Sequence, residues 1–174
     1  KQTVGVYPLL TDETCWFLAA DFDKASWQED AHAFLQTCSE LNIPAALERS
    51  RSGRGGHIWI FFEAALPAGL ARKLGAALLT RTMERRHQLG LDSYDRLFPS
   101  QDTMPKGGFG NLIALPLQKH PREHGHSAFV DDHFVAHPDQ WAWLSAIRRI
   151  SRAQVDDIVR GAERRGRVVG VRVP

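Results

Sequence analysis

Apolar and polar positions follow two different periods along this chain, and these periods predict strands and helices in turn. A run of apolar residues over 15–23 has the composition of a buried strand and ends in two acids. Apolar residues then recur every three to four positions over 27–41, which predicts an amphipathic helix that Asn42 and Pro44 end. Further strands are predicted at 45–50, 58–62, 111–117 and 127–131.

The second half of the chain carries more helical patterns, separated by a segment rich in glycine and proline. Helices are predicted over 67–86, from Pro138 onward and from Ser151 onward. Ser26 with Glu29, and Ser151 with Gln154, fit the capping box, in which side chains and backbone N–H groups pair at a helix start. Residues 100–110 contain too many breakers to be regular, and 168–173 suit either a closing strand or a linker.

Length and composition place the chain among ordinary water-soluble proteins. Its 174 residues suit one domain, with a division into an N-terminal lobe (1–65) and a second lobe (66–174) left open. The first residue is Lys, so we expect a fragment of a longer protein, and no run nears the roughly 18 apolar residues that cross a bilayer. Cys15 and Cys38 lie in apolar patterns and are expected to be buried free thiols in a reducing cytoplasm.

Asp21 and Asp23 end the first predicted strand and are the first candidates for chemistry. Alternation along a strand places both side chains on one face, with Phe22 on the other. Two adjacent carboxylates repel each other unless a cation lies between them, and hard oxygen ligands suit Mg²⁺ or Mn²⁺. The alternative is a pair of solvated acids at a strand end.

A glycine-rich segment precedes the apolar strand at 58–62. Its three glycines allow a tight backbone with free N–H groups, which could form a nest for phosphate oxygens. The alternative is a glycine-rich hairpin with a structural histidine. The candidate phosphate ligands of this segment are Arg51, Ser52, Arg54 and the backbone at Gly53, while His57 would lie where the loop becomes strand.

Two other charged features have weaker implications. Arginines gather at 49–54, 81–86 and 145–174, where they suit either contact with a polyanion or solvated helix faces. The histidine-rich segment 120–126 resembles a metal-binding tract by composition, but no cysteine accompanies it, which favours a hairpin tip.

The order of three motifs resembles the archaeo-eukaryotic primase superfamily: an acid pair, a Ser-to-His element and a later acid at Asp95. The sequence around these motifs is most similar to the primase domains of TOTE conflict systems and the related CRISPR-associated primase-polymerases, and the similarity covers most of residues 4–145. The similar stretches are Tyr7-Pro-Leu-Leu, Leu18-Ala-Ala-Asp-Phe-Asp-Lys24, Tyr94-Asp-Arg-Leu-Phe-Pro-Ser-Gln-Asp102 and Gly108-Phe-Gly-Asn-Leu-Ile-Ala-Leu-Pro-Leu-Gln118.

This resemblance implies an α/β (α+β) catalytic core with a mainly antiparallel sheet, related to the RNA-recognition fold, and flanking helices. It implies that Asp21, Asp23 and Asp95 bind two divalent metal ions, with Asp92 as the alternative third acid. His57, Ser52 and the loop backbone would hold the triphosphate of the incoming nucleotide. Further phosphate contacts are expected, from chemistry alone, at Lys24, Arg51, Arg54 and Lys106.

The leading hypothesis is a DNA-templated primase-polymerase that uses a single-stranded template, a primer and NTP or dNTP, with two Mg²⁺ or Mn²⁺ ions. Helicase, nuclease or CRISPR-adaptation modules are the expected neighbours in the longer chain. One alternative is a metal-dependent nuclease or phosphoesterase that uses the same acids. The other is a non-catalytic single-stranded nucleic-acid-binding module, in which Trp59, Phe61 and Phe109 would stack on bases. Sugar preference and the ability to begin a chain without a primer stay open.

Overall fold

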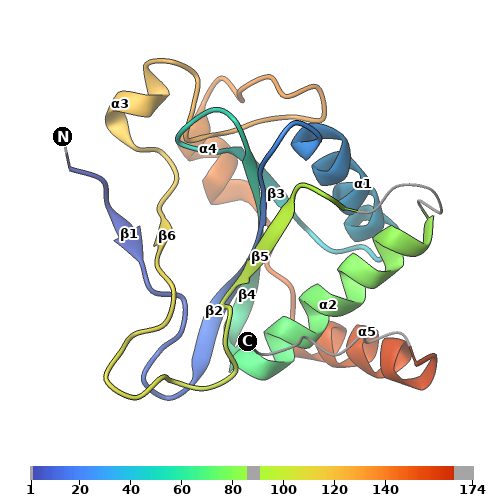
Figure 1. The fold of residues 1–174 in the computed structure, drawn as a ribbon. Helices are drawn as coiled ribbons and strands as arrows, with labels where there is room; N and C mark the ends of the chain where they lie inside the picture. The colour runs from blue at the N-terminus through green and yellow to red at the C-terminus, as the bar shows by residue number, and fades with distance from the viewer. Residues whose placement is uncertain (1, 86–90, 167–174) are drawn as a thin grey trace.

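An antiparallel five-stranded sheet forms the centre of the computed structural model, which describes residues 2–85 and 91–166 (Figure 1). The strand order is β5-β2-β4-β3-β7, and it combines strands from both 1–65 and 66–174. The predicted mixed α/β class with a mainly antiparallel sheet is confirmed. The strands are β2 (Thr14–Phe22), β3 (Ala46–Arg49), β4 (Gly56–Pro67), β5 (Tyr94–Phe98) and β7 (Ala128–Phe129).

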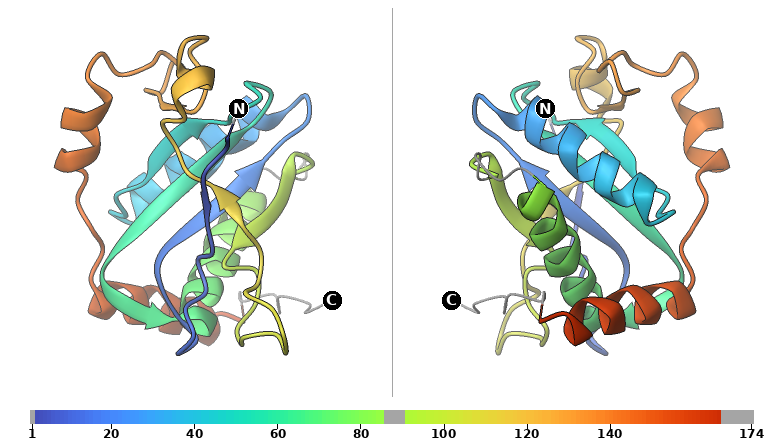
Figure 2. Two further views of the ribbon diagram at one scale, coloured as in Figure 1. Left: turned by 90° about the vertical axis from the view of Figure 1, so that its left-hand side faces the viewer. Right: turned by 90° about the vertical axis from the view of Figure 1, so that its right-hand side faces the viewer.

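Three helices cover one face of this sheet, as the two side views of Figure 2 show. They are α1 (Trp27–Glu40), α2 (Ala68–Arg85) and α5 (Arg152–Arg164), close to the predicted ranges. The capping box at Ser151 is confirmed, because Ser151 and Gln154 exchange both hydrogen bonds. The box at Ser26 is wrong. The Ser26 backbone is not extended, and its hydroxyl donates instead to the buried carboxylate of Asp30, at 3.1 Å.

The opposite face carries a smaller layer made by the remaining elements. A two-stranded sheet of β1 (Gly5–Val6) and β6 (Ile113–Ala114) lies there with α4 (Gln140–Ala146), so the strand predicted at 111–117 shortens to two residues. The hairpin tip predicted at 120–126 is wrong. Because β6 and β7 belong to different sheets, the chain crosses between them through a short helix, α3 (Lys119–Arg122), and a turn.

Alternation along β2 explains how both faces of the sheet are buried. Leu18, Ala20 and Phe22 join the large core beneath the helices, while Ala19 joins a second core around Trp59 on the opposite face. Trp59 is therefore 2% exposed and cannot stack on a base, as the binding-module alternative required.

The irregular segment and the buried cysteines predicted from the sequence are also found among the described residues. Residues 100–110 contain no helix or strand, and Cys15 and Cys38 are buried and unpaired. Within the described ranges, no helix has the length and apolar character needed to cross a membrane. The strand or linker predicted at 168–173 lies outside these ranges.

Candidate active site

Four polar side chains form a row across one end of the sheet, on the face away from α1, α2 and α5. Strand register places Asp21 opposite His57, His57 opposite Glu48, and Arg96 opposite Asp21. Directly opposed residues of antiparallel strands project from the same face with Cβ atoms roughly 5 Å apart. The order across the sheet is therefore Arg96, Asp21, His57 and Glu48.

His57 is held between two carboxylates. Its Nε2 lies 3.4 Å from Asp21 Oδ1, and its Nδ1 lies 3.0 Å from Glu48 Oε2. Burial of the ring lowers its pKa, but the hydrogen bonds and charges of Asp21 and Glu48 outweigh burial and raise the pKa from 6.5 to about 9. The ring is therefore an imidazolium at neutral pH, a cation at the edge of the candidate site.

Glu48 is a site residue that sequence reasoning missed. Its side chain is 2% exposed, and its Oε2 also accepts a hydrogen bond from Trp59 Nε1 at 2.8 Å. A buried carboxylate needs such partners, because an unpaired buried charge is strongly unfavourable. The only signal in the sequence is an acid inside the apolar segment Ala46-Leu47-Glu48, and its partners come from strand pairing that the local sequence does not reveal.

The glycine-rich segment is a hairpin turn between β3 and β4. Ser50 N–H donates to Gly55 O at 2.8 Å, Gly53 N–H donates to Ser50 O at 2.9 Å, and Arg54 N–H donates to Ser52 Oγ at 3.2 Å. The hairpin itself is thus confirmed, whereas phosphate binding by its side chains and the role of His57 stay predictions. The predicted nest is wrong for Gly53 and Arg54, because the turn itself uses their N–H groups.

Two glycines fit this turn against its neighbours. Gly53 has a φ of +74°, and a Cβ there would lie 2.3 Å from Nε2 of His126. A Cβ on Gly55 would lie 2.6 Å from Phe22 O, at the end of β2. Since real Cβ atoms do not approach so closely, glycine at position 53 lets the turn lie against His126, and glycine at position 55 lets it lie against the strand end that carries the acids.

A depression of about 600 Å³ lies between the end of β2 and this turn. It brings together several residues that the sequence singled out, although they come from two separate motifs. Lys24 also donates from Nζ to the backbone carbonyl of Asp92, at 3.2 Å. The predicted residues that line the depression are Asp21, Asp23, Lys24, Ser52 and Arg54.

Asp95 lies at a bulge in β5. Asp21 pairs with Arg96 and Phe22 pairs with Tyr94, so Asp95 is the extra residue. Its Oδ2 accepts a hydrogen bond from Arg96 Nε at 2.7 Å. That bond and the charge of Asp95, followed by the charges of Asp21 and Asp23, raise the pKa of Arg96, so the guanidinium lies in the field of all three acids.

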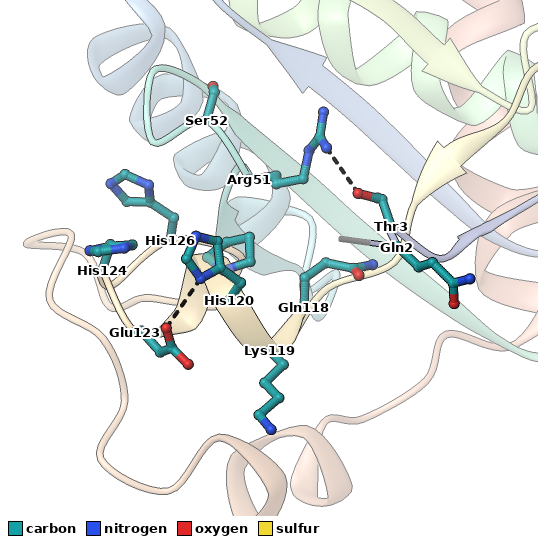
Figure 3. Close-up of a pocket in the computed structure, with 11 residues that line it drawn as sticks. Gln2, Thr3, Arg51, Ser52, Gln118, Lys119, His120, Glu123, His124 and His126 are labelled. Atoms are coloured by element: carbon teal, nitrogen blue, oxygen red, sulfur yellow. Dashed lines mark hydrogen bonds and ion pairs between the residues drawn. The ribbon is translucent and has the colours of Figure 1, made fainter.

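Four of the predicted phosphate ligands do not line the depression: Arg51, Gly53, His57 and Lys106. Arg51 Nη1 donates to Thr3 Oγ1 at 2.9 Å and lines a second pocket, of about 670 Å³, on the other side of the turn (Figure 3). Lys106 is exposed on the irregular segment 100–110 and does not line the depression.

The chemical type of the three aspartates Asp21, Asp23 and Asp95 suits a divalent metal ion, but their oxygen atoms are not close together in this structure. Carboxylate oxygens are the ligands that Mg²⁺ and Mn²⁺ prefer. Among the described residues, the group whose ligand atoms all lie within 4.8 Å of one another is His120, Glu123 and His124, and the three aspartates form no such group. Arg96 holds Asp95 in an ion pair instead.

Comparison with known proteins assigns the class. The model of the "TOTE conflict system, Archaeo-Eukaryotic Primase domain" matches residues 1–158. The chain therefore belongs to this family of primase-polymerase domains, which supports nucleotidyltransferase-type activity in general terms. The resemblance noted from the motifs is confirmed.

No curated protein gives a significant match to this chain, whereas five chains of known structure do. One of them is described as "Polymerase Domain from Mycobacterium tuberculosis Ligase D in complex with DNA". It is 18% identical, with a TM-score of 0.42, and the match covers 90% of this chain and 54% of that one. This chain thus spans about half the length of that polymerase-domain chain.

Proposed function

We propose that this chain is a DNA-templated nucleotidyltransferase that extends or begins a primer on a single-stranded template, using nucleoside triphosphates. The observation that carries the proposal is the depression lined by Asp21, Asp23, Ser52 and Arg54, with His57 bonded to Asp21 at its edge. Carboxylates for a metal and cationic donors for phosphate thus meet at one place, as phosphoryl transfer from a triphosphate requires.

The residues would divide the work between metal and phosphate. Asp21, Asp23 and Asp95 would hold two divalent ions, Mg²⁺ or Mn²⁺. When bound, such ions lower the pKa of the attacking 3′-hydroxyl and neutralise charge on the leaving pyrophosphate. Arg54 and the hydroxyl of Ser52 would donate to the triphosphate, and protonated His57 would add positive charge beside it.

Asp95 is the better candidate for the third acid than Asp92. Asp95 lies on the strand paired with Asp21, and its charge reaches the same guanidinium as those of Asp21 and Asp23. Asp92 precedes that strand and contacts Lys24 through its backbone carbonyl. For Asp95 to reach a shared metal, its bond to Arg96 would have to open. The two side chains are 37% and 49% exposed, which permits that movement.

Incorporation of labelled nucleotides on a single-stranded DNA template tests the proposal, with and without primer, with NTP or dNTP, and in Mg²⁺ or Mn²⁺. We expect polymer products from the native protein and none from the Asp21→Ala/Asp23→Ala variant, while exposed Asp132→Ala serves as a matched control with normal activity. Products from the double variant would refute the role of the acids. Degradation of the labelled strand without added nucleotide would instead indicate the nuclease alternative.

A further inference from the structure

Three side chains that could bind a metal converge on one turn outside the candidate active site. His120, Glu123 and His124 follow an i, i+3, i+4 spacing, which places them on one face of a helical turn. Backbone bonds define that turn: Glu123 N–H donates to His120 O at 3.2 Å, and His124 N–H donates to Pro121 O at 3.0 Å. The segment for which the sequence favoured a hairpin tip thus carries a compact group of three possible ligands.

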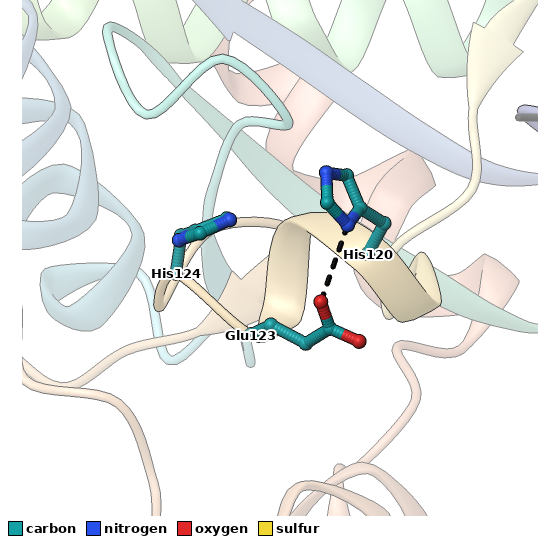
Figure 4. Close-up of side chains that lie close together, drawn as sticks. All are labelled: His120, Glu123 and His124. Carbon is teal, nitrogen blue, oxygen red and sulfur yellow. Dashed lines mark hydrogen bonds and ion pairs between the residues drawn. The ribbon is translucent and has the colours of Figure 1, made fainter.

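The side chains already approach one another in the absence of an ion. His120 Nδ1 lies 3.2 Å from Glu123 Oε2, and the rings of His120 and His124 lie 5.4 Å apart at 89° (Figure 4). All three ligand atoms lie within 4.8 Å of one another. Tetrahedral Zn²⁺ with bonds of about 2.0–2.1 Å holds its ligand atoms roughly 3.3 Å apart, so small rotations of these exposed side chains are enough.

We propose that His120, Glu123 and His124 bind one transition-metal ion of the Zn²⁺ type. Two imidazoles and one carboxylate suit Zn²⁺, Co²⁺ or Ni²⁺ rather than Mg²⁺, which prefers oxygen ligands alone. Three protein ligands leave a coordination position for water.

The site adjoins the turn between β3 and β4. The pocket that the three ligands line also includes Arg51 and Ser52. Just beyond the ligands, the His126 ring lies against Gly53, and Ser127 N–H donates to Ser50 O at 3.3 Å. A bound ion would therefore fix the segment that supports the turn beside the acid pair, without contacting those acids.

Metal titration of the tag-free protein tests this site, because an affinity tag of histidines would bind the same ions. After treatment with a chelator, Zn²⁺ is titrated by calorimetry, and Co²⁺ by its visible absorption, which is intense in tetrahedral sites. We expect one equivalent of Zn²⁺ and a tetrahedral Co²⁺ spectrum from the native protein, with a higher Tm in Zn²⁺. His120→Gln and His124→Gln are expected to lose both signals.

Two controls separate this site from others. His133→Gln removes an exposed histidine outside the turn and is expected to bind metal normally. Asp21→Ala/Asp23→Ala removes the catalytic candidates and is also expected to bind one Zn²⁺, so the result does not depend on nucleotide incorporation. Absence of Zn²⁺ binding by the native protein, or unchanged binding by a folded His124→Gln variant, would overturn the assignment.

Discussion

The pairing of His57 with Glu48 leads to a prediction that can be measured directly. Glu48→Gln keeps the size of the side chain and an oxygen that can accept from Trp59 Nε1, but removes the negative charge 3.0 Å from His57 Nδ1. Since that charge favours the imidazolium, we expect the His57 pKa to fall in this variant. Asp132→Asn is the matched control, because it removes an exposed carboxylate from outside the row and also keeps the size of the side chain.

The size of the effect follows from the environment of His57. A pKa raised from 6.5 to about 9 corresponds to about 3 kcal/mol of preference for the charged ring, after burial has opposed it. Asp21 and Glu48 share that preference, and one nearby opposite charge typically changes a pKa by about 1 to 3. Glu48→Gln is therefore expected to lower the pKa of His57 by about 1 or more.

An NMR titration of the metal-free protein measures this pKa, with the His57 signal assigned from His57→Gln. The same linkage affects stability. Because the folded pKa lies above the unfolded value, the contribution of His57 to the free energy of unfolding is complete below pH 6.5 and is lost as pH rises through about 9. That loss should be smaller in Glu48→Gln. A His57 pKa near 6.5 in the native protein, or one unchanged by Glu48→Gln, would refute the reasoning.

Two further predictions concern the turn and the thiols. Gly53→Ala should lower the free energy of unfolding in urea by about 1 kcal/mol or more, because φ is +74° and the His126 ring fills the space beside Gly53. Adding His126→Ala should recover part of this loss. If the effects of the two substitutions on the free energy of unfolding were strictly additive, the contact would be contradicted. Burial raises the pKa of Cys15 and Cys38 to about 12. Neither thiol should therefore react with a disulfide reagent at pH 8 until the chain unfolds. Rapid reaction in the folded state would contradict their burial.

Local patterns predicted most elements of this fold because their periods match how each segment is buried. The strand over 15–23 and the helix over 27–41 each place an apolar face on the large core, and the structure reproduces them within a residue or two. The prediction of a hairpin tip at 120–126 was wrong because the conformation of this segment depends on β6 and β7, which lie in different sheets. Composition alone does not encode that separation.

The candidate site shows the same limit more clearly. Asp21, Asp23, Ser52 and Arg54 are recognisable from their motifs, and the structure brings them to one depression. Glu48 and Arg96 are not recognisable, because each acts through a partner on a neighbouring strand. A nest of free N–H groups was predicted from the glycine content, but the N–H groups of Gly53 and Arg54 form hydrogen bonds within the turn.

Asp95, the candidate third acid, shows why strand alternation does not predict the face on which each residue of β5 lies. On a regular strand, Tyr94 and Arg96 would share a face and Asp95 would point to the other. Instead Tyr94 packs on Phe22 in the core beneath the helices, with ring centroids 6.2 Å apart, while Arg96 faces Asp21 on the opposite side. The bulge at Asp95 therefore absorbs the break in alternation. It leaves this carboxylate 37% exposed beside Arg96, rather than buried with Leu97.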